Sequence, residues 1–249
     1  MLLRAHNLRG YQLLAKNGEL GHVKDLFFDE DYWTVRYFIV DTGHWLPGKR
    51  VLISPSAIKG SPDPDKKDIP VPTLTTDQVK AAPPVDTKRP VSRQKEIEIN
   101  LHYGWPNYWY TPMNAPDVTP TAAPPPLKTE KKEPDKEEAH LRSMEEVRGY
   151  HIQSKDGEFG HVEDFIADDA DWRIRYLIVN TKNFLPGKNV LISNNWITEI
   201  DWAQSRISAD LFEETINNSP EYDEQHPLTR EQEEELFDHY DKLPYWNHK

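Results

Sequence analysis

The chain has 249 residues, of which 42 are acidic and 30 basic, and its formal net charge is −12. This acidic total argues against sequence-independent binding of nucleic acid, which requires a basic surface that displaces counterions. The sequence contains no cysteine, so disulfides, thiolate metal sites, iron–sulfur clusters and cysteine nucleophiles are excluded.

The first third of the chain predicts short strands joined by tight turns. Apolar and aromatic residues alternate from Trp33 to Asp41, and Asn17-Gly18 has the composition of a two-residue hairpin turn. Six short strands favour closure into a small barrel, because closure removes exposed sheet edges and gives one core. The strands are expected at residues 10–15, 20–28, 33–41, 50–54, 57–60 and 69–73.

Two helices follow the predicted strands, and each has a counterpart near the end of the chain. Proline ends the shorter helix in both places, at Pro83 and at Pro220. Thr229 and Gln232 open the last helix with the spacing of a capping box. The helices are expected at residues 75–81, 92–103, 209–217 and 229–241.

An internal duplication decides the architecture. Residues 9–54 align with residues 148–193 at a constant offset of 139 without a gap, and 25 of the 46 positions are identical. Further along, the offset becomes 137, which places a two-residue deletion at a hairpin tip of the second copy. The matches at this offset are Pro90, Arg93, Glu96, His102, Tyr103, Tyr108 and Trp109 with Pro227, Arg230, Glu233, His239, Tyr240, Tyr245 and Trp246.

We therefore predict a mainly β protein of two tandem barrels of about six strands each. The first half spans residues 1–113 and the second half residues 139–249, and each barrel is followed by a helical tail. The halves are expected to be related by an internal pseudo-two-fold, as in a covalent homodimer. Residues 114–138 are rich in proline and charge and predict an extended linker; a proline-rich docking segment is the alternative.

Charge and hydropathy add two expectations. The first half has 15 basic and 13 acidic residues, whereas the second has 11 basic and 23 acidic residues, so the halves are not interchangeable. No apolar run approaches the roughly 20 residues that cross a bilayer. Met1 to His6 are too few and too polar for a secretory signal, and we expect a cytoplasmic protein.

Five motifs recur in the same order in both halves. They are a Gly-Tyr start, a Gly-x-x-Gly-His-Val-x-Asp hairpin, a Trp-x-Val/Ile-Arg-Tyr-x-Ile-Val strand, a Leu-Pro-Gly-x-x-Val-Leu-Ile-Ser segment and a Tyr-Trp tail. Together they resemble the PRC-barrel family, the β-barrel of the photosynthetic reaction-centre H subunit and of a bacterial ribosome-maturation factor. The resemblance implies a small, partly open barrel that serves protein interaction or assembly and has no common enzymatic chemistry. The membrane helix of the H subunit and the N-terminal domain of the maturation factor have no counterpart here. The reaction-centre role is therefore not expected, and the resemblance supports ribosomal binding only weakly.

Histidines and acidic turns are the candidates for chemistry. His22 and His161 could be ligands or pH-sensitive groups, although a position in a hairpin explains them, and His102 and His239 suit a helix end. The acidic turns after Phe28 lack the spacing of a calcium loop. No serine elbow or phosphate loop is present. We predict no catalytic, cofactor-binding or metal-binding residue, no cofactor and no enzymatic activity.

The aromatic tails are the most suggestive surface. Each could cover its own barrel as a latch, or pack on the other half or on a partner, because buried Trp and Tyr often anchor interfaces. The candidate interaction residues are Trp105, Tyr108, Trp109, Tyr245 and Trp246.

The leading hypothesis is a non-catalytic assembly or regulatory module whose two repeats pack on each other and bind protein partners. The first alternative is a ligand-binding or sensing barrel with a mouth lined by Trp33, Tyr37, Trp172 and Tyr176. The second, a ribosome- or RNA-associated accessory role, rests on the family resemblance alone. Further homo-oligomerisation is left open.

Overall fold

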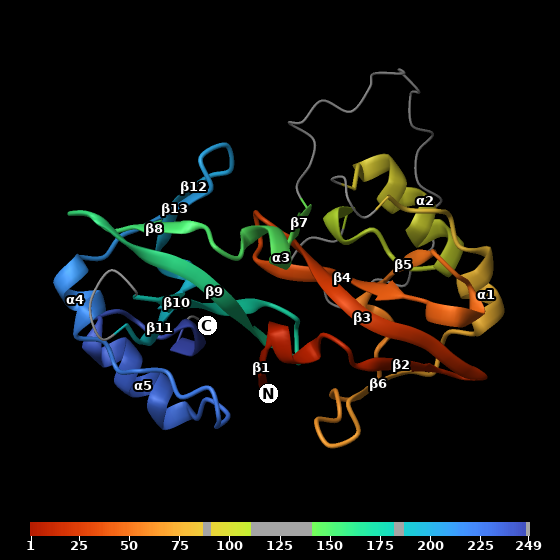
Figure 1. Ribbon diagram of the computed structural model, residues 1–249, viewed down its shortest axis with the longest axis horizontal. Coiled ribbons are helices and arrows are strands. Elements are labelled where there is room, and N and C mark those ends of the chain that lie inside the picture. The colour runs from red at the N-terminus through yellow and green to blue at the C-terminus, as the bar shows by residue number, and fades with distance from the viewer. Residues whose placement is uncertain (87–90, 111–140, 182–186, 248–249) are drawn as a thin grey trace.

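The computed structural model describes residues 1–86, 91–110, 141–181 and 187–247. Two lobes lie side by side, each built from a bent sheet with helices on its outer side (Figure 1). The fold is mainly β with short helices, as predicted. The predicted linker at residues 114–138 lies outside the described residues.

The first sheet has six strands, and five of them come from the first half. These are β2 (Gln12–Ala15), β3 (Gly18–Asp29), β4 (Thr34–Asp41), β5 (Arg50–Ile53) and β6 (Asp68–Val71). Their order is β5-β4-β3-β2-β6, with β2 and β6 parallel. The sixth strand, β7 (Leu141–Ser143), comes from the second half and pairs with β3.

The second sheet has seven strands, and six of them come from the second half. These are β8 (His151–Gln153), β9 (Glu158–Asp168), β10 (Ile174–Asn180), β11 (Asn189–Ser193), β12 (Ile197–Asp201) and β13 (Arg206–Ala209). Their order is β11-β10-β9-β8-β13-β12. The seventh strand, β1 (Leu2–Arg4), comes from the first half and pairs with β9.

The five α-helices of the described residues are short and lie at the junction or on the outer sides of the lobes. They are α1 (Thr76–Ala81), α2 (Arg93–Tyr103), α3 (Met144–Val147), α4 (Glu213–Asn217) and α5 (Arg230–His239). The predicted capping box of Thr229 and Gln232 opens α5, and Thr75 with Gln78 forms another at α1. Within the described ranges, no helix has the length and apolarity to cross a membrane.

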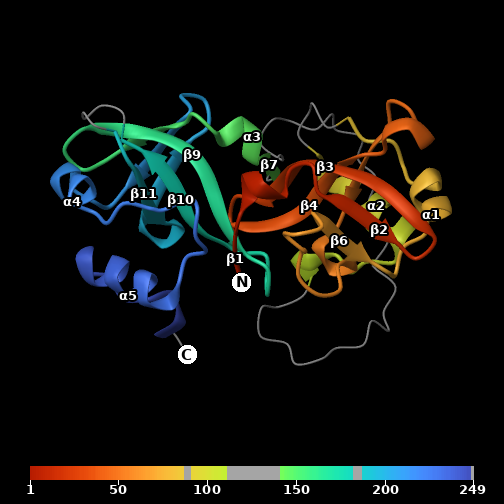
Figure 2. The same ribbon diagram turned by 60° about the horizontal axis from the view of Figure 1, so that its bottom comes forward.

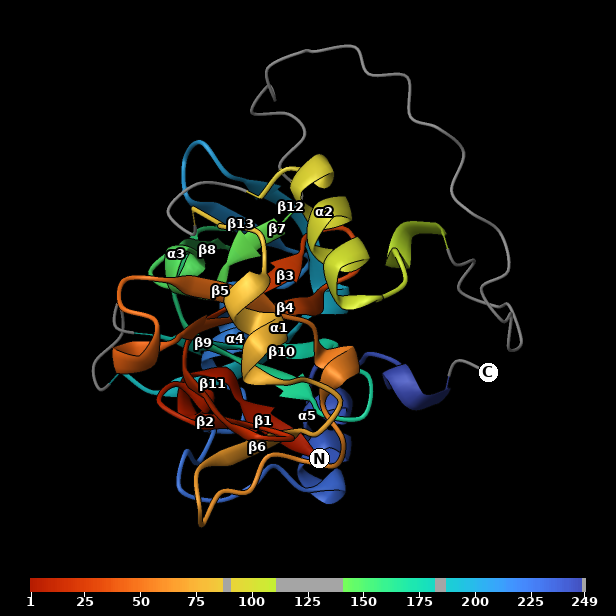
Figure 3. The same cartoon turned by 90° about the vertical axis from the view of Figure 1, so that its right-hand side faces the viewer.

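The strand ladder of neither sheet closes into a barrel, contrary to the closure predicted from the sequence. The first ladder ends at β5 and β6 and the second at β11 and β12. Helices cover faces of the sheets that a closed barrel would have enclosed. In the first lobe, α1 and α2 lie over the sheet (Figure 3), and in the second lobe α5 lies below it (Figure 2).

The strand predicted at residues 57–60 is absent. Residues Pro55–Ala57 form a 3-10 helix, and a single bridge joins Asp63 to Asp68. The second half forms a full hairpin, β12 and β13, at the corresponding place. Pro62 and Pro64 explain the difference, because proline lacks the N–H that a strand ladder requires.

Apolar side chains are buried on both faces of the first sheet. Phe38 and Val40 belong to the large core that continues into the second half, whereas Tyr37 and Ile39 on the other face pack with Ile99 of α2. Because both faces are covered, β4 is a nearly continuous buried run rather than an alternation of buried and exposed residues.

Candidate functional site at the junction of the two halves

The halves are joined by a reciprocal exchange of strands. β1 adds to β9, and β7 adds to β3, so each half completes the sheet of the other (Figure 2). The two registers correspond residue for residue at the offset of 139. The pairs are Leu2 with Asp168, Leu3 with Ala167 and Arg4 with Ile166, and Leu141 with Asp29, Arg142 with Phe28 and Ser143 with Phe27. An isolated bridge also joins Thr34 to Arg173, the residue before β10.

Two tryptophans at equivalent positions hold a left-handed backbone at this junction. Trp33 has φ of 50° and Trp172 has φ of 59°, a conformation that costs a bulky residue about 1–3 kcal/mol. The carbonyl of Trp33 accepts from the Ile174 amide at 2.7 Å, and that of Trp172 accepts from the Val35 amide at 2.8 Å. The ring of Trp172 also meets Phe38 edge-on at 4.9 Å. Bonds between the halves thus hold the strained turns in place.

Two equivalent aspartates anchor the exchanged segments. Asp164 is buried and accepts from Arg4 Nε at 2.6 Å and from the His6 amide at 3.2 Å. Asp25 accepts from the hydroxyl of Ser143 in the same arrangement. Burial raises the pKa of both carboxyls, and the hydrogen bonds from the opposite half work against that rise.

A buried glutamate fastens the helical tail of the first half. Glu96 is 0% exposed on α2 and accepts from the Tyr108 hydroxyl at 3.1 Å and from Arg93 at 3.3 Å. The Tyr37 hydroxyl lies 3.3 Å from Glu96 Oε2 and 3.1 Å from Asn100 Oδ1. We call Arg93, Glu96, Tyr37 and Tyr108 the Glu96 cluster.

The same cluster occurs in the second half. Glu233 accepts from the hydroxyls of Tyr176 at 2.7 Å and Tyr245 at 3.0 Å, and it pairs with Arg230 at 3.0 Å. Burial raises the pKa of Tyr176 far above its ordinary value, and burial together with the charge of Glu233 raises the pKa of Tyr245 to about 12. Both hydroxyls therefore keep their protons and donate to the carboxylate. Arg230, Glu233, Tyr176 and Tyr245 form the Glu233 cluster.

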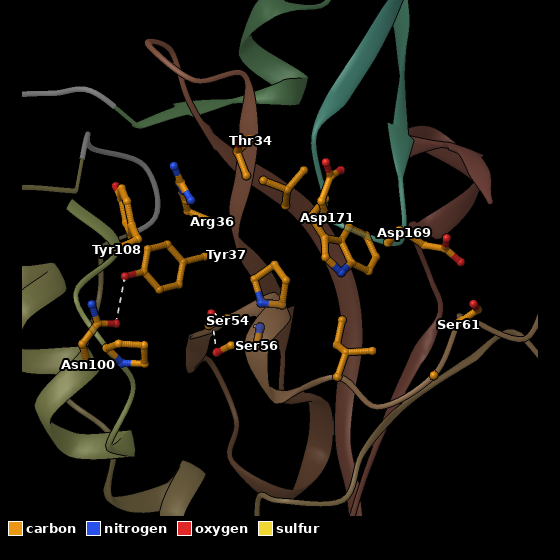
Figure 4. Close-up of a pocket in the computed structure, with 17 residues that line it drawn as sticks. Thr34, Arg36, Tyr37, Ser54, Ser56, Ser61, Asn100, Tyr108, Asp169 and Asp171 are labelled. Atoms are coloured by element: carbon orange, nitrogen blue, oxygen red, sulfur yellow. Dashed lines mark hydrogen bonds between the residues drawn. The ribbon is translucent and has the colours of Figure 1, made fainter. Parts of the chain in front are cut away.

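A cavity of about 640 Å³ lies between the lobes, beside the Glu96 cluster. Its walls come from β4, the loop after β5, α2 with the segment that follows it, and the turn between β9 and β10. Figure 4 places Arg36, Tyr108 and Asn100 at one end and Asp169 with Ser61 at the other. The lining residues are Thr34 to Tyr37, Ser54 to Ser56, Ile58, Gly60, Ser61, Asn100, Pro106, Tyr108 and Asp169 to Trp172.

Comparison with known families identifies the first lobe. Residues 1–77 match the family model of the PRC-barrel domain. The first half carries a PRC-barrel domain. The match takes in β1 to β6 and ends at the start of α1, so α2 and the aromatic tail lie beyond it, and the second half is not covered. No curated protein matches the chain.

The predicted interaction residues pack against their own half. In the tail that follows the PRC-barrel domain, Arg36 lies 3.8 Å over the Tyr108 ring and Arg93 lies 4.0 Å over Trp109. Trp105 stacks on the neighbouring ring of Tyr103 at 4.2 Å. In the second half, Arg175 covers Tyr245 at 4.5 Å and Arg230 covers Trp246 at 3.9 Å. All five rings are half-buried, so each keeps part of its surface accessible.

The candidate histidines of the two halves have different surroundings. His22 is exposed, and His161 is 3.8 Å from Glu163. His102 and His239 each lie 2.8 Å from a backbone carbonyl oxygen, that of Gln78 or Thr215, in the preceding helix. Asp29 accepts from the amides of its own turn, which accounts for the acidic residue there. Across the described residues, no three His, Asp or Glu side chains gather as a metal site would require.

The four aromatic residues proposed for a barrel mouth are buried, with Trp33 the most exposed at 9%. Only Tyr37 and Trp172 among them line the cavity beside the PRC-barrel domain. Sequence reasoning missed the roles of Arg36, Glu96 and Glu233. A signal was present, since Arg93 and Glu96 recur as Arg230 and Glu233 at the offset of 137.

Proposed function

We propose that this protein is a non-catalytic assembly or regulatory module that acts through contacts with other proteins. We further propose that its halves are tandem PRC-barrel-like repeats related by a pseudo-two-fold and held as one body. The observation that carries this proposal is the reciprocal addition of β1 to β9 and of β7 to β3 with matching registers. A body of this kind presents each repeated surface twice, which suits a protein that bridges two partners or acts as a scaffold.

The polar groups of the junction support a structural rather than a chemical role. Asp25, Asp164, Glu96 and Glu233 each receive hydrogen bonds from side chains or amides that hold two segments together. A carboxylate whose lone pairs are used in this way is poorly placed to act as a general base on a substrate. We therefore propose that the protein is not an enzyme. As a separate proposal, it works in the cytoplasm.

The aromatic tails are the proposed contact surface. Each half places a tryptophan under an arginine, Trp109 under Arg93 and Trp246 under Arg230, and both tryptophans are only half-buried. Trp, Tyr and Arg are enriched at the energetic centres of protein interfaces. Because the second half is far more acidic than the first, we propose that the two tails meet partners of different charge.

Quantitative affinity capture from the native cell tests this proposal. Trp109→Ala, Trp246→Ala and the double variant are compared with the wild-type chain, and Phe212→Ala, which removes a ring that is 54% exposed outside the tails, is the matched control. We expect specific proteins to be lost with the tryptophan variants and retained with the control. Undiminished capture by a folded double variant would contradict the proposed surface, and scattering from two freely moving lobes would contradict the single body.

A further inference from the structure

The loop before β6 and the hairpin of β12 and β13 are structural counterparts in the two halves. Lys67 and Ser205 end the two tips with a left-handed backbone, at φ of 55° and 53°. The carbonyl oxygen of each accepts from the first amide of the neighbouring strand, β2 or β8, at 2.9 Å. Counting three residues back from these fixed points places Pro64 where the second half has Trp202. The pairs that close the two tips agree with this register, and they are Asp63 with Asp68 and Asp201 with Arg206.

The indole ring of Trp202 packs into its own half. The guanidinium of Arg142 lies 4.1 Å from the centre of this ring, and the ring centre of Tyr150 lies 6.0 Å from it. Trp202 is half-buried and packs against the large core. At the offset of 139, the counterparts of Arg142 and Tyr150 are Leu3 and Tyr11. The first half therefore keeps one aromatic wall of this arrangement, but the residue at the position of the indole is a proline.

A second, smaller cavity of about 280 Å³ lies at this place in the first half. The counterparts of the residues around Trp202 line it, namely Leu3, Tyr11, Pro62 and Pro64, and Leu228 of the second half lines it as well. Most of its lining residues are apolar or aromatic. An apolar cavity holds water poorly and favours an apolar guest. Trp202 in the second half shows what kind of group fits between these walls: one flat aromatic ring system.

The cationic groups that line the smaller cavity already have acidic partners. The pairs are Arg4 with Asp164 and Glu224, the amino group of Met1 with Asp169, and His226 with Asp223. An anionic guest would have to compete with these carboxylates. Glu224 is the carboxylate among the lining residues, and because it pairs with Arg4 it does not call for a cationic guest. A neutral guest leaves all of these pairs intact.

The loop before β6 also limits how a ring can reach the cavity. In the second half, the hairpin itself carries the indole into place. In the first half, the corresponding stretch of chain from Pro62 to Pro64 forms part of the wall, so a ring attached to a main chain cannot arrive by the same route. The volume lies just below the range of roughly 300–1,000 Å³ that drug-sized ligands occupy, which indicates a free molecule of one or two fused rings.

We infer that this cavity binds a neutral, planar aromatic small molecule of about the size of indole. Its ring takes the place that Trp202 occupies in the second half and packs against Tyr11 and Leu3. The site goes beyond the proposed protein contacts, because neither Trp109 nor Trp246 lines it.

NMR titration of the full ¹⁵N-labelled chain with indole tests the inference. We expect saturable shift changes at the amides of Leu3, Tyr11, Asp63 and Leu228. Cyclohexanol, which is neutral but not planar, should bind at least fivefold more weakly. N-acetyl-tryptophanamide represents a tryptophan side chain of a partner protein. Indole shifts that do not saturate would overturn the inference, and tighter binding of N-acetyl-tryptophanamide than of indole would make a protein side chain the occupant instead.

Two variants and a matched control locate the binding. Pro64→Trp copies the second half and supplies the ring from the chain itself, so the affinity for indole should fall at least tenfold. Leu228→Ala removes an apolar contact from the other half and should weaken binding about threefold or more. Asp65→Trp places the same ring at the next position, which is exposed, and should leave binding unchanged. Binding that is unaffected by both Pro64→Trp and Leu228→Ala, or that falls equally in Asp65→Trp and Pro64→Trp, would contradict the assigned site.

Discussion

At the scale of single residues, the duplication identifies two equivalent positions where the backbone geometry admits only glycine. Gly21 lies in β3 with φ of +132°, and an added Cβ would lie 2.1 Å from the carbonyl oxygen of Asp41. The equivalent Gly160 would place a Cβ 2.3 Å from the carbonyl oxygen of Asn180. Neighbouring strands approach so closely at both places that only glycine fits.

Replacing Gly21 by alanine is therefore expected to lower the free energy of unfolding by about 2 kcal/mol or more, because backbone atoms must move. Gly157→Ala is the control. Its φ is ordinary, and the added Cβ would meet only the end of the Glu213 side chain at 3.0 Å. Urea unfolding of both variants measures the difference, and equal losses would show that the close approach is not the cause.

The Glu233 cluster gives a second prediction at this scale. Tyr176 is fully buried and donates to a carboxylate, so Tyr176→Phe should lower the free energy of unfolding by about 1.5–3 kcal/mol. Tyr32→Phe removes the hydroxyl of a residue that is 50% exposed and should change stability by less than about 0.5 kcal/mol. Thermal and urea unfolding compare the two, and similar values would mean that the hydrogen bond contributes little.

At the scale of elements, β1 and β7 are three residues each, yet they carry the connection between the halves. The sequence could not predict them, because three residues are too short for a periodic pattern and their partners lie far away in the chain. The longer strands and helices were predictable from alternation and capping. The loop after β5 was not predictable in this way, because Pro62 and Pro64 prevent the hairpin that the second half forms at the corresponding place.

Arg4 connects β1 to the opposite half. Arg4→Ala leaves the buried Asp164 without its cation and is expected to lower the free energy of unfolding by about 2 kcal/mol or more. Hydrogen exchange should also rise in β9, in the other half. Arg206→Ala, which removes a partly exposed arginine 3.8 Å from Asp201, should do neither. Faster hydrogen exchange confined to the first half would contradict the pairing of β1 with β9 of the second half.

The two junction aspartates predict a pH dependence. Their folded pKa values are raised above the ordinary value, mainly by burial, so the folded state binds more protons than the unfolded state in that interval. Their contribution to stability is fully present below the unfolded pKa and falls as pH rises through the folded pKa. Asp25→Asn removes one such group, and its stability relative to the wild type should increase from pH 3.5 to pH 7. Urea unfolding at each pH measures this difference. A relative decrease in the stability of the variant over that range would show that the folded pKa of Asp25 is not raised.

At the scale of the whole molecule, one architecture is used in two ways. The first half keeps a cavity beside Pro64 where the second half places the ring of Trp202, and the second half carries most of the negative charge. The duplication and the mainly β class followed from the sequence. The unclosed ladders and the cavity did not, since they depend on which side chains meet across the junction. Arg36 could not be singled out, because its contacts with Asp29 and with the Tyr108 ring exist only in three dimensions.

The exchanged strands also determine what a broken chain would do. A protease that cut once between residues 111 and 140 would leave two fragments, each retaining a strand that belongs to the sheet of the other. The fragments should therefore co-elute as a single particle under native conditions and separate only in denaturant. Two genes, one for each half, would by the same logic yield a heterodimer when expressed together, whereas fragments that drift apart on a sizing column would show that the covalent connection itself keeps the lobes in contact.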